Sequence, residues 1–143
     1  MKALTINKTY PDENQNAAAN KEMRKCVQYA FHNNIMIIED FEITDANKTE
    51  LLLDIALMID NAKGATVAIL TYEPDNLLVD GLPNIFIPLV ASGQLEIHIV
   101  RYGLRFHQDS PHEQLTENGF KAMTEQAFWA ELFEDYDKKL IPQ

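Results

Sequence analysis

Residues 65–75 read ATVAILTYEPD, an apolar run that ends in a short acidic turn. The first eight of them, Ala65–Tyr72, have the length and composition of a β-strand buried on both faces. Glu73 and Asp75 follow this strand directly. The carboxyl ends of parallel strands open on one edge of a sheet, where α/β proteins place their sites. The stretch therefore predicts a buried parallel strand with carboxylates at the edge where function is expected.

The rest of the chain alternates between strand and helix patterns in the same way. Further strands are predicted from short apolar or alternating runs, at Ala3–Ile6, Ile35–Ile38 and Leu95–Tyr102. Helices are predicted from apolar spacing of three and four residues, at Ala17–His32, 48–62 and Glu125–Lys139. We expect an α/β single-domain sandwich over residues 1–143, with a mostly parallel sheet of about four strands flanked by helices.

Several boundaries depend on local signals. Thr124 is expected to cap the last helix, and Phe106–Asn118 is expected to be a loop. Residues 77–92 leave two structures open. They form either a hairpin around Asp80-Gly81 or a short helix that ends at Gly93.

The composition excludes several classes of protein. Lys and Arg total 12 against 22 Asp and Glu, giving a net charge of −10. This balance disfavours sequence-independent nucleic-acid binding and anionic membranes, so we expect no direct nucleic-acid contact and no membrane partner. The single Cys26 cannot form an intramolecular disulfide, and with no secretory leader it predicts a cytoplasmic location.

Ten of the 22 acidic residues lie between Glu39 and Asp80, opposed only by Lys48 and Lys63. Several of them follow predicted strands, so we expect one strongly negative face. The candidate partner-binding residues are the acids at or near these strand ends, namely Glu39, Asp40, Glu42, Glu73, Asp75 and Asp80.

Catalytic and metal motifs are weak. No phosphate loop, glycine-rich nucleotide motif or nucleophile elbow occurs, and Cys26 is expected to be a small buried hydrophobe. The loop His107–Glu113 holds donors for a divalent metal, but its spacing matches no signature. We therefore predict no catalytic residue, no metal and no cofactor.

One arrangement keeps an enzymatic alternative open. Glu39 after one strand and the pair Glu73 and Asp75 after another resemble the TOPRIM family over about 40 residues. That resemblance implies carboxylates holding Mg²⁺ for phosphoryl transfer. Asp40 stands where the family has a glycine, and the pair is Glu-x-Asp rather than Asp-x-Asp. A small metal-dependent nuclease or phosphotransferase is thus the alternative function.

The leading hypothesis is an acidic inhibitor that occupies the basic cleft of a partner protein. Toxin-immunity proteins and phage anti-defence proteins work in this way, and carboxylates compete there with nucleic acid. The hexapeptide Gln114–Gly119 resembles one in acidic ribonuclease inhibitors of the barstar type, but none of their contact residues carries over. Whether the chain is an enzyme stays uncertain, and a binding protein is favoured.

The helix around residues 48–62 is apolar on more than one side. Leu51, Ile55 and Met58 belong to the stripe that can cover the sheet. Leu53 and Leu57 fall outside that stripe, and we expect them to support a possible homodimer.

Overall fold

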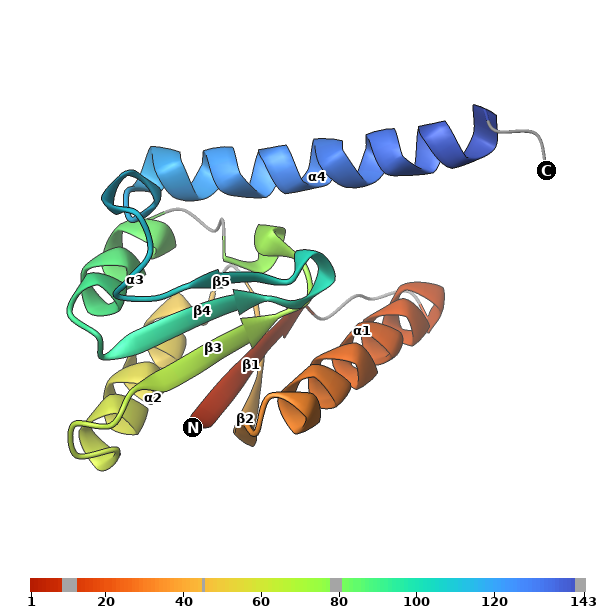
Figure 1. Ribbon diagram of the computed structural model, residues 1–143. Helices are drawn as coiled ribbons and strands as arrows, with labels where there is room; N and C mark the ends of the chain where they lie inside the picture. Colours follow the sequence, from red (N-terminus) through yellow and green to blue (C-terminus); the bar gives the residue numbers. More distant parts are fainter. Residues whose placement is uncertain (9–12, 45, 78–80, 141–143) are drawn as a thin grey trace.

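The computed structural model describes residues 1–8, 13–44, 46–77 and 81–140. Within them the chain alternates strands and helices (Figure 1). The strands are β1 (Lys2–Lys8), β2 (Met36–Ile43), β3 (Val67–Thr71), β4 (Leu95–Ile99) and β5 (Leu104–Phe106). The α-helices are α1 (Glu13–His32), α2 (Lys48–Asn61), α3 (Leu82–Ala91) and α4 (Glu117–Leu140). Single-turn 3₁₀ helices lie between them, at Pro74–Asn76, Val100–Tyr102 and His112–Gln114.

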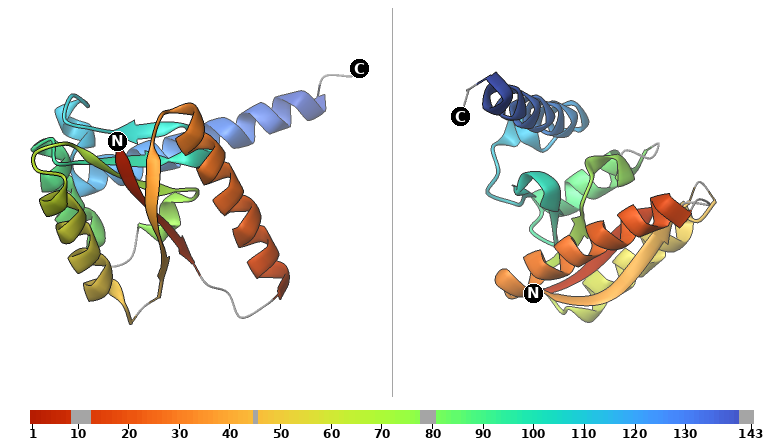
Figure 2. Two further views of the ribbon diagram at one scale, coloured as in Figure 1. Left: turned by 90° about the horizontal axis from the view of Figure 1, so that it is seen from below. Right: turned by 90° about the vertical axis from the view of Figure 1, so that its right-hand side faces the viewer.

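The strands form one sheet in the order β2-β1-β3-β4-β5. β1 to β4 are parallel, and β5 runs antiparallel to β4, with Ile97 opposite Phe106. Figure 2 shows α1 on one side of the sheet and α2 with α3 on the other. The predicted α/β fold with a mostly parallel sheet is confirmed.

The main core lies between the sheet and the pair α2 and α3. Leu51, Ile55 and Met58 of α2 are buried there, as the helical stripe predicted. Phe86 of α3 is fully buried, and so is Ile69 of β3. For residues 77–92 the sequence left a hairpin and a helix open, and the structure has the helix α3 there. Gly93, which follows this helix, is in the left-handed conformation. Asp80 lies outside the described residues.

β2 is longer and more exposed than expected. Ile35–Ile38 was predicted as a short strand, but β2 runs to Ile43 and, within the described residues, pairs only with β1. Met36 and Ile38 remain exposed because β2 is the edge of the sheet. Glu39, Asp40 and Glu42 therefore lie within β2 rather than after it.

β5 is the strand that the sequence pattern missed. It has three residues, and the 3₁₀ turn Val100–Tyr102 separates it from β4. Its pairing covers β4, so β4 is an inner strand rather than an edge strand. Every residue of β4 is buried, including Glu96 and His98.

α4 begins eight residues earlier than the predicted Glu125. The backbone N–H of Gly119 donates to the Thr116 hydroxyl at 3.0 Å, which makes Thr116 the N-cap. Thr124 is instead a buried residue within the helix, and its hydroxyl donates to the Lys121 carbonyl. Phe120 anchors this first part of α4 in the core, whereas the second part extends beyond the sheet in Figure 1. None of the described helices is long and apolar enough to cross a membrane.

Candidate functional site

The carboxyl edge of the sheet is organised around Thr71, the last residue of β3. Its hydroxyl lies 3.1 Å from the Ile6 carbonyl and 3.0 Å from the Glu73 carbonyl. Buried Asn76 donates from Nδ2 to the Thr71 hydroxyl at 2.8 Å and to the Ile6 carbonyl at 3.3 Å. These bonds tie β1, β3 and the turn Pro74–Asn76 into one rigid corner.

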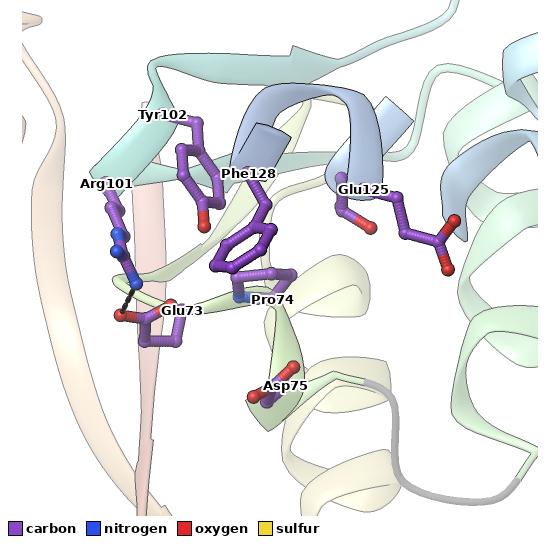
Figure 3. Close-up of a pocket in the computed structure, with 8 residues that line it drawn as sticks. Glu73, Pro74, Asp75, Arg101, Tyr102, Glu125 and Phe128 are labelled. Atoms are coloured by element: carbon purple, nitrogen blue, oxygen red, sulfur yellow. Dashed lines mark hydrogen bonds and ion pairs between the residues drawn. The ribbon is translucent and has the colours of Figure 1, made fainter. Parts of the chain in front are cut away.

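A cavity of about 320 Å³ opens beside this corner, beneath α4 (Figure 3). Tyr102, Phe128 and Pro74 form its apolar wall, and Glu73 and Arg101 form an ion pair at one side of it. The full lining is Glu73, Pro74, Asp75, Arg101, Tyr102, Thr124, Glu125 and Phe128. The predicted site residues Glu73 and Asp75 thus share one cavity.

Arg101 joins the cavity to α4. Its guanidinium contacts Glu73 Oε1 at 2.6 Å and Glu131 Oε1 at 2.7 Å. The hydrogen bond to Glu131 is the main reason that the pKa of Arg101 is raised, and the same bond lowers the pKa of Glu131. Arg101 is therefore engaged by two carboxylates and holds α4 against the sheet.

The acids of β2 do not join this cavity, because β1 lies between β2 and β3. Asp40 accepts hydrogen bonds from the Thr5 hydroxyl at 2.7 Å and from Asn7 Nδ2, on the face covered by α1. Glu39 turns the other way, and a hydrogen bond with Asp54 of α2 is the largest cause of its raised pKa. Adjacent acids on a strand point to opposite faces, so Glu39 and Asp40 do not contribute to one shared negative face.

The expected partner-binding set is therefore divided in space. Glu73 and Asp75 line the cavity, whereas Glu39, Asp40 and Glu42 belong to the edge strand β2. Their role in binding a partner stays a prediction. Among the described residues no three His, Cys, Asp or Glu side chains gather as a metal site would require.

A buried polar network on the α1 face was missed by the sequence analysis. The Tyr29 hydroxyl lies 2.6 Å from His98 Nδ1, and His98 Nε2 lies 3.2 Å from Glu96 Oε2. Arg105 of β5 donates to the same Glu96 carboxylate. The alternation of β4, which sets Glu96 and His98 on one face, was the available signal, but their partners come from α1 and the unrecognised β5.

Burial and pairing shift the acidity of this network in defined directions. Burial is the largest effect on His98 and lowers its pKa, although Glu96 opposes that shift. For Glu96, burial alone would raise the pKa, but its hydrogen bonds with Arg105 and His98 outweigh it and hold the pKa low. The network thus contains a neutral imidazole next to an ionised carboxylate.

Cys26 is buried in α1, as predicted. Burial raises the pKa of its thiol to about 12, and nearby Glu22 and Asp40 add to the shift. A thiol that stays protonated is not a nucleophile.

Comparisons with known proteins give a match of fold without a match of sequence. No protein-family model matches the chain, and no similar sequence was found among curated proteins. A resolvase family site-specific recombinase from Streptococcus pneumoniae is similar in structure, with a TM-score of 0.60 and 10% identity over 98% of both chains. The C-terminal catalytic domain of ISC1926 TnpA, an IS607-like serine recombinase, has a TM-score of 0.52 and 13% identity over 86% of this chain and 80% of that one. The N-terminal catalytic domain of TP901-1 integrase gives a TM-score of 0.50 and 10% identity over 99% and 100%.

These likenesses correct the predicted function. The hypothesis of an acidic inhibitor or immunity protein is contradicted, and so is its alternative, a metal-dependent nuclease, because the similar structures are recombinases. The expected basic protein partner and the expected absence of direct nucleic-acid contact are contradicted by the same finding. Composition misled both predictions, since a net charge describes a whole chain and says nothing of one local surface. The described residues therefore have the fold of a recombinase catalytic domain.

Proposed function

We propose that this chain acts in DNA recombination, as a resolvase-like subunit that self-associates through α4. The observation that carries the proposal is the likeness over 98% of both chains to a site-specific recombinase. A fold alone does not fix an activity, so the surfaces of this chain must supply the rest. We keep with this proposal the cytoplasmic location predicted from the lone Cys26.

The second support is the apolar face of α4. Its outer part exposes a stripe with helical spacing, and each side chain is between 44% and 62% exposed: Phe128, Trp129, Leu132, Phe133 and Tyr136. A patch of this kind on a protein surface usually marks an interface. A second copy of the same helix presents the same apolar stripe, so the two can pair about a twofold axis.

The free energy gained by burying the α4 stripe favours a dimer that depends on protein concentration. Burying one large apolar side chain fully contributes roughly 1.5–3 kcal/mol. Ten such side chains from two copies, each already about half buried, give roughly 7–15 kcal/mol. Association costs about 4–15 kcal/mol, which is of the same size as the gain, so we expect the dimer to form only as the protein concentration rises.

We do not propose a serine nucleophile for this chain. The sequence has two serines, Ser92 and Ser110. Ser92 precedes β4 and Ser110 follows the antiparallel β5, so both lie at the end of the sheet opposite to Thr71. The Ser92 hydroxyl donates to the Leu89 carbonyl, and the Ser110 hydroxyl accepts from the His107 N–H.

The hydroxyl of Thr5 lies next to a carboxylate that could act as a base, but a substrate cannot reach it. Thr5 donates to Asp40, the pairing that an activated nucleophile needs, yet Thr5 is completely buried within β1. We therefore propose a role in assembling the recombination complex, without a serine of this chain attacking DNA.

Sedimentation tests the assembly. Wild type is expected to dimerise with rising concentration, and the double variant Leu132→Glu/Phe133→Glu is expected to stay monomeric. The matched control is Leu53→Glu/Leu57→Glu on α2, where both leucines are 60% exposed. If the α2 variant loses the dimer and the α4 variant keeps it, the predicted homodimer through Leu53 and Leu57 replaces the α4 interface.

The link to recombination needs a separate experiment in the native host. Crosslinking followed by sequencing of the recovered DNA should enrich DNA at junctions of rearrangement, and deletion of the gene should lower the frequency of those rearrangements. Recovery of no specific DNA, with an unchanged rearrangement frequency, would contradict the proposal.

A further inference from the structure

One face of α1 carries basic and amide side chains at helical spacing. Lys21, Arg24, Lys25, Gln28 and His32 follow one another at intervals of three, one, three and four residues, and all five are exposed. Residues three and four apart lie on the same side of a helix, so these side chains share one face. Figure 2, right, shows α1 lying across the front of the sheet, apart from α4. We call these five residues the basic face of α1.

Three cations outside α1 are paired with carboxylates in the described part of the chain. Arg101 is held by Glu73 and Glu131, and Arg105 by Glu96. Lys121 pairs with Glu117 one helical turn away. The ion pairs within the described residues include none from Lys21, Arg24 or Lys25.

Lys25 is the member of the basic face that also contacts the body of the protein. Its Nζ donates to the Tyr72 hydroxyl at 3.2 Å and lies 5.1 Å from the centre of the Tyr72 ring. Tyr72 is the residue after β3, so this contact places the basic face next to the carboxyl edge. A neutral phenol leaves the charge of Lys25 in place.

The acidic balance of the whole chain does not cancel this local charge. Residues 21–32 hold three cations and one acid, Glu22, within a chain of net charge −10. Burial raises the pKa of Glu22, and the neighbouring Glu73 adds to the shift, so Glu22 is less readily ionised than an exposed acid. Charges farther away than about 8 Å are largely screened at physiological salt.

We infer that the basic face of α1 binds the phosphate backbone of duplex DNA. The inference rests on the proposed function, which supplies DNA as the partner, and adds the surface that contacts it. Every charged or amide group on the face can donate hydrogen bonds to phosphate oxygens, and the arginine fork can donate two at once. Contacts of this kind position a protein on DNA without reading its sequence.

Salt dependence measures the contact directly. Binding of wild-type protein to a fluorescent 30-base-pair duplex of arbitrary sequence is followed by anisotropy between 50 and 200 mM salt. Each phosphate neutralised contributes about −0.9 to the slope of log K against log salt, so three cations predict a slope of roughly −2 to −3. The triple variant Lys21→Gln/Arg24→Gln/Lys25→Gln should bind at least tenfold more weakly at 50 mM salt, with a slope near zero.

Two further triple variants separate local contact from net charge. Lys2→Gln/Lys63→Gln/Lys121→Gln removes the same charge from exposed positions elsewhere and should keep the wild-type slope. Lys21→Arg/Arg24→Lys/Lys25→Arg keeps the charge on α1 and should bind like wild type. Equal weakening by both glutamine triples would overturn the inference, and so would wild-type protein that fails to bind the duplex at 50 mM salt.

The outcomes also distinguish this inference from the function on which it rests. If the host experiment links the chain to rearranged DNA while the α1 variant binds normally, the basic face is excluded and the proposed function stands. If the salt slope depends on α1 but the host shows no rearrangement, the surface stands and the recombination role fails.

Discussion

The sheet face under α2 and α3 is a continuous apolar core, whereas the face under α1 mixes small apolar residues with buried polar groups. Phe86, Ile69 and Leu51 are fully buried on the first face. On the second, the apolar contact of α1 includes a small cluster around Ala30 and Leu70. Hydrogen bonds add to the contact of α1: the Tyr29 hydroxyl bonds to His98 of β4, and Asn7 Nδ2 of β1 lies 3.3 Å from Met23 Sδ.

This difference separates stability from positioning. Apolar burial is strong and non-directional, so α2 and α3 hold the fold together. Hydrogen bonds contribute little net stability but fix geometry and are costly to leave half made. α1, which carries the basic face, is therefore positioned by groups that respond to single-atom changes and to pH.

The largest expected effect is on the apolar face. Phe86→Ala should lower the free energy of unfolding by about 3–5 kcal/mol, because it removes a fully buried ring and leaves a cavity. Its neighbour Ile85 is 40% exposed, and Ile85→Ala should cost less than about 1 kcal/mol. Urea unfolding of both variants checks this. Similar losses for the two would show that α3 is not held by its buried side.

An intermediate effect is expected on the α1 face. Tyr29→Phe removes the hydroxyl that donates to His98 Nδ1 and leaves a buried acceptor without its partner, at a cost of about 1–3 kcal/mol. The substitution should accelerate amide hydrogen exchange more in α1 than in α2. The control Tyr72→Phe removes a hydroxyl that contacts the exposed Lys25, and we expect about 0.5 kcal/mol or less. Equal effects of the two substitutions would mean that the network does not hold α1.

The fold class could be predicted because its signals are local. Ala65–Tyr72 contains β3, and Gly93 follows α3, since a long apolar run and a left-handed glycine act through their nearest neighbours in sequence. β5 escaped because three residues carry too little periodicity. The start of α4 was predicted too late in the sequence. Thr124 is a residue type that often caps a helix, but it lies buried within α4, whereas Thr116 caps the helix.

The site was harder to predict because it depends on which strands are neighbours. Glu39 and Glu73 both follow apolar runs, yet β1 separates their strands and Glu39 turns towards Asp54. The Tyr29, His98 and Arg105 contacts join α1, β4 and β5, a pairing that no pattern within one segment reveals. The same holds for the apolar stripe of α4, which has core-like spacing but is about half exposed.

The smallest expected effect is the response of the α1 face to pH. His98 is faced by Tyr29 of α1, Glu96 of β4 and Arg105 of β5, with His107 also near. Burial lowers its pKa in the folded protein below the ordinary 6.5, so the unfolded chain binds the proton first as the pH falls. Stability contributed by neutral His98 is therefore complete above about pH 6.5 and is lost as the pH falls below it, by at most about 1.4 kcal/mol per pH unit.

Urea unfolding at pH 7.5 and 5.5 isolates this contribution when wild type is compared with His98→Gln. The glutamine amide can still bond to both Tyr29 and Glu96 but does not titrate, so its loss of stability between the two pH values should be smaller than that of wild type. Glu96 does not confuse the result, because its lowered pKa puts its own loss below pH 4.5. His112→Gln, at an exposed histidine, should keep the wild-type response. If His98→Gln loses as much stability as wild type, the proton is taken up elsewhere, and the two faces of the sheet do not differ in their response to pH.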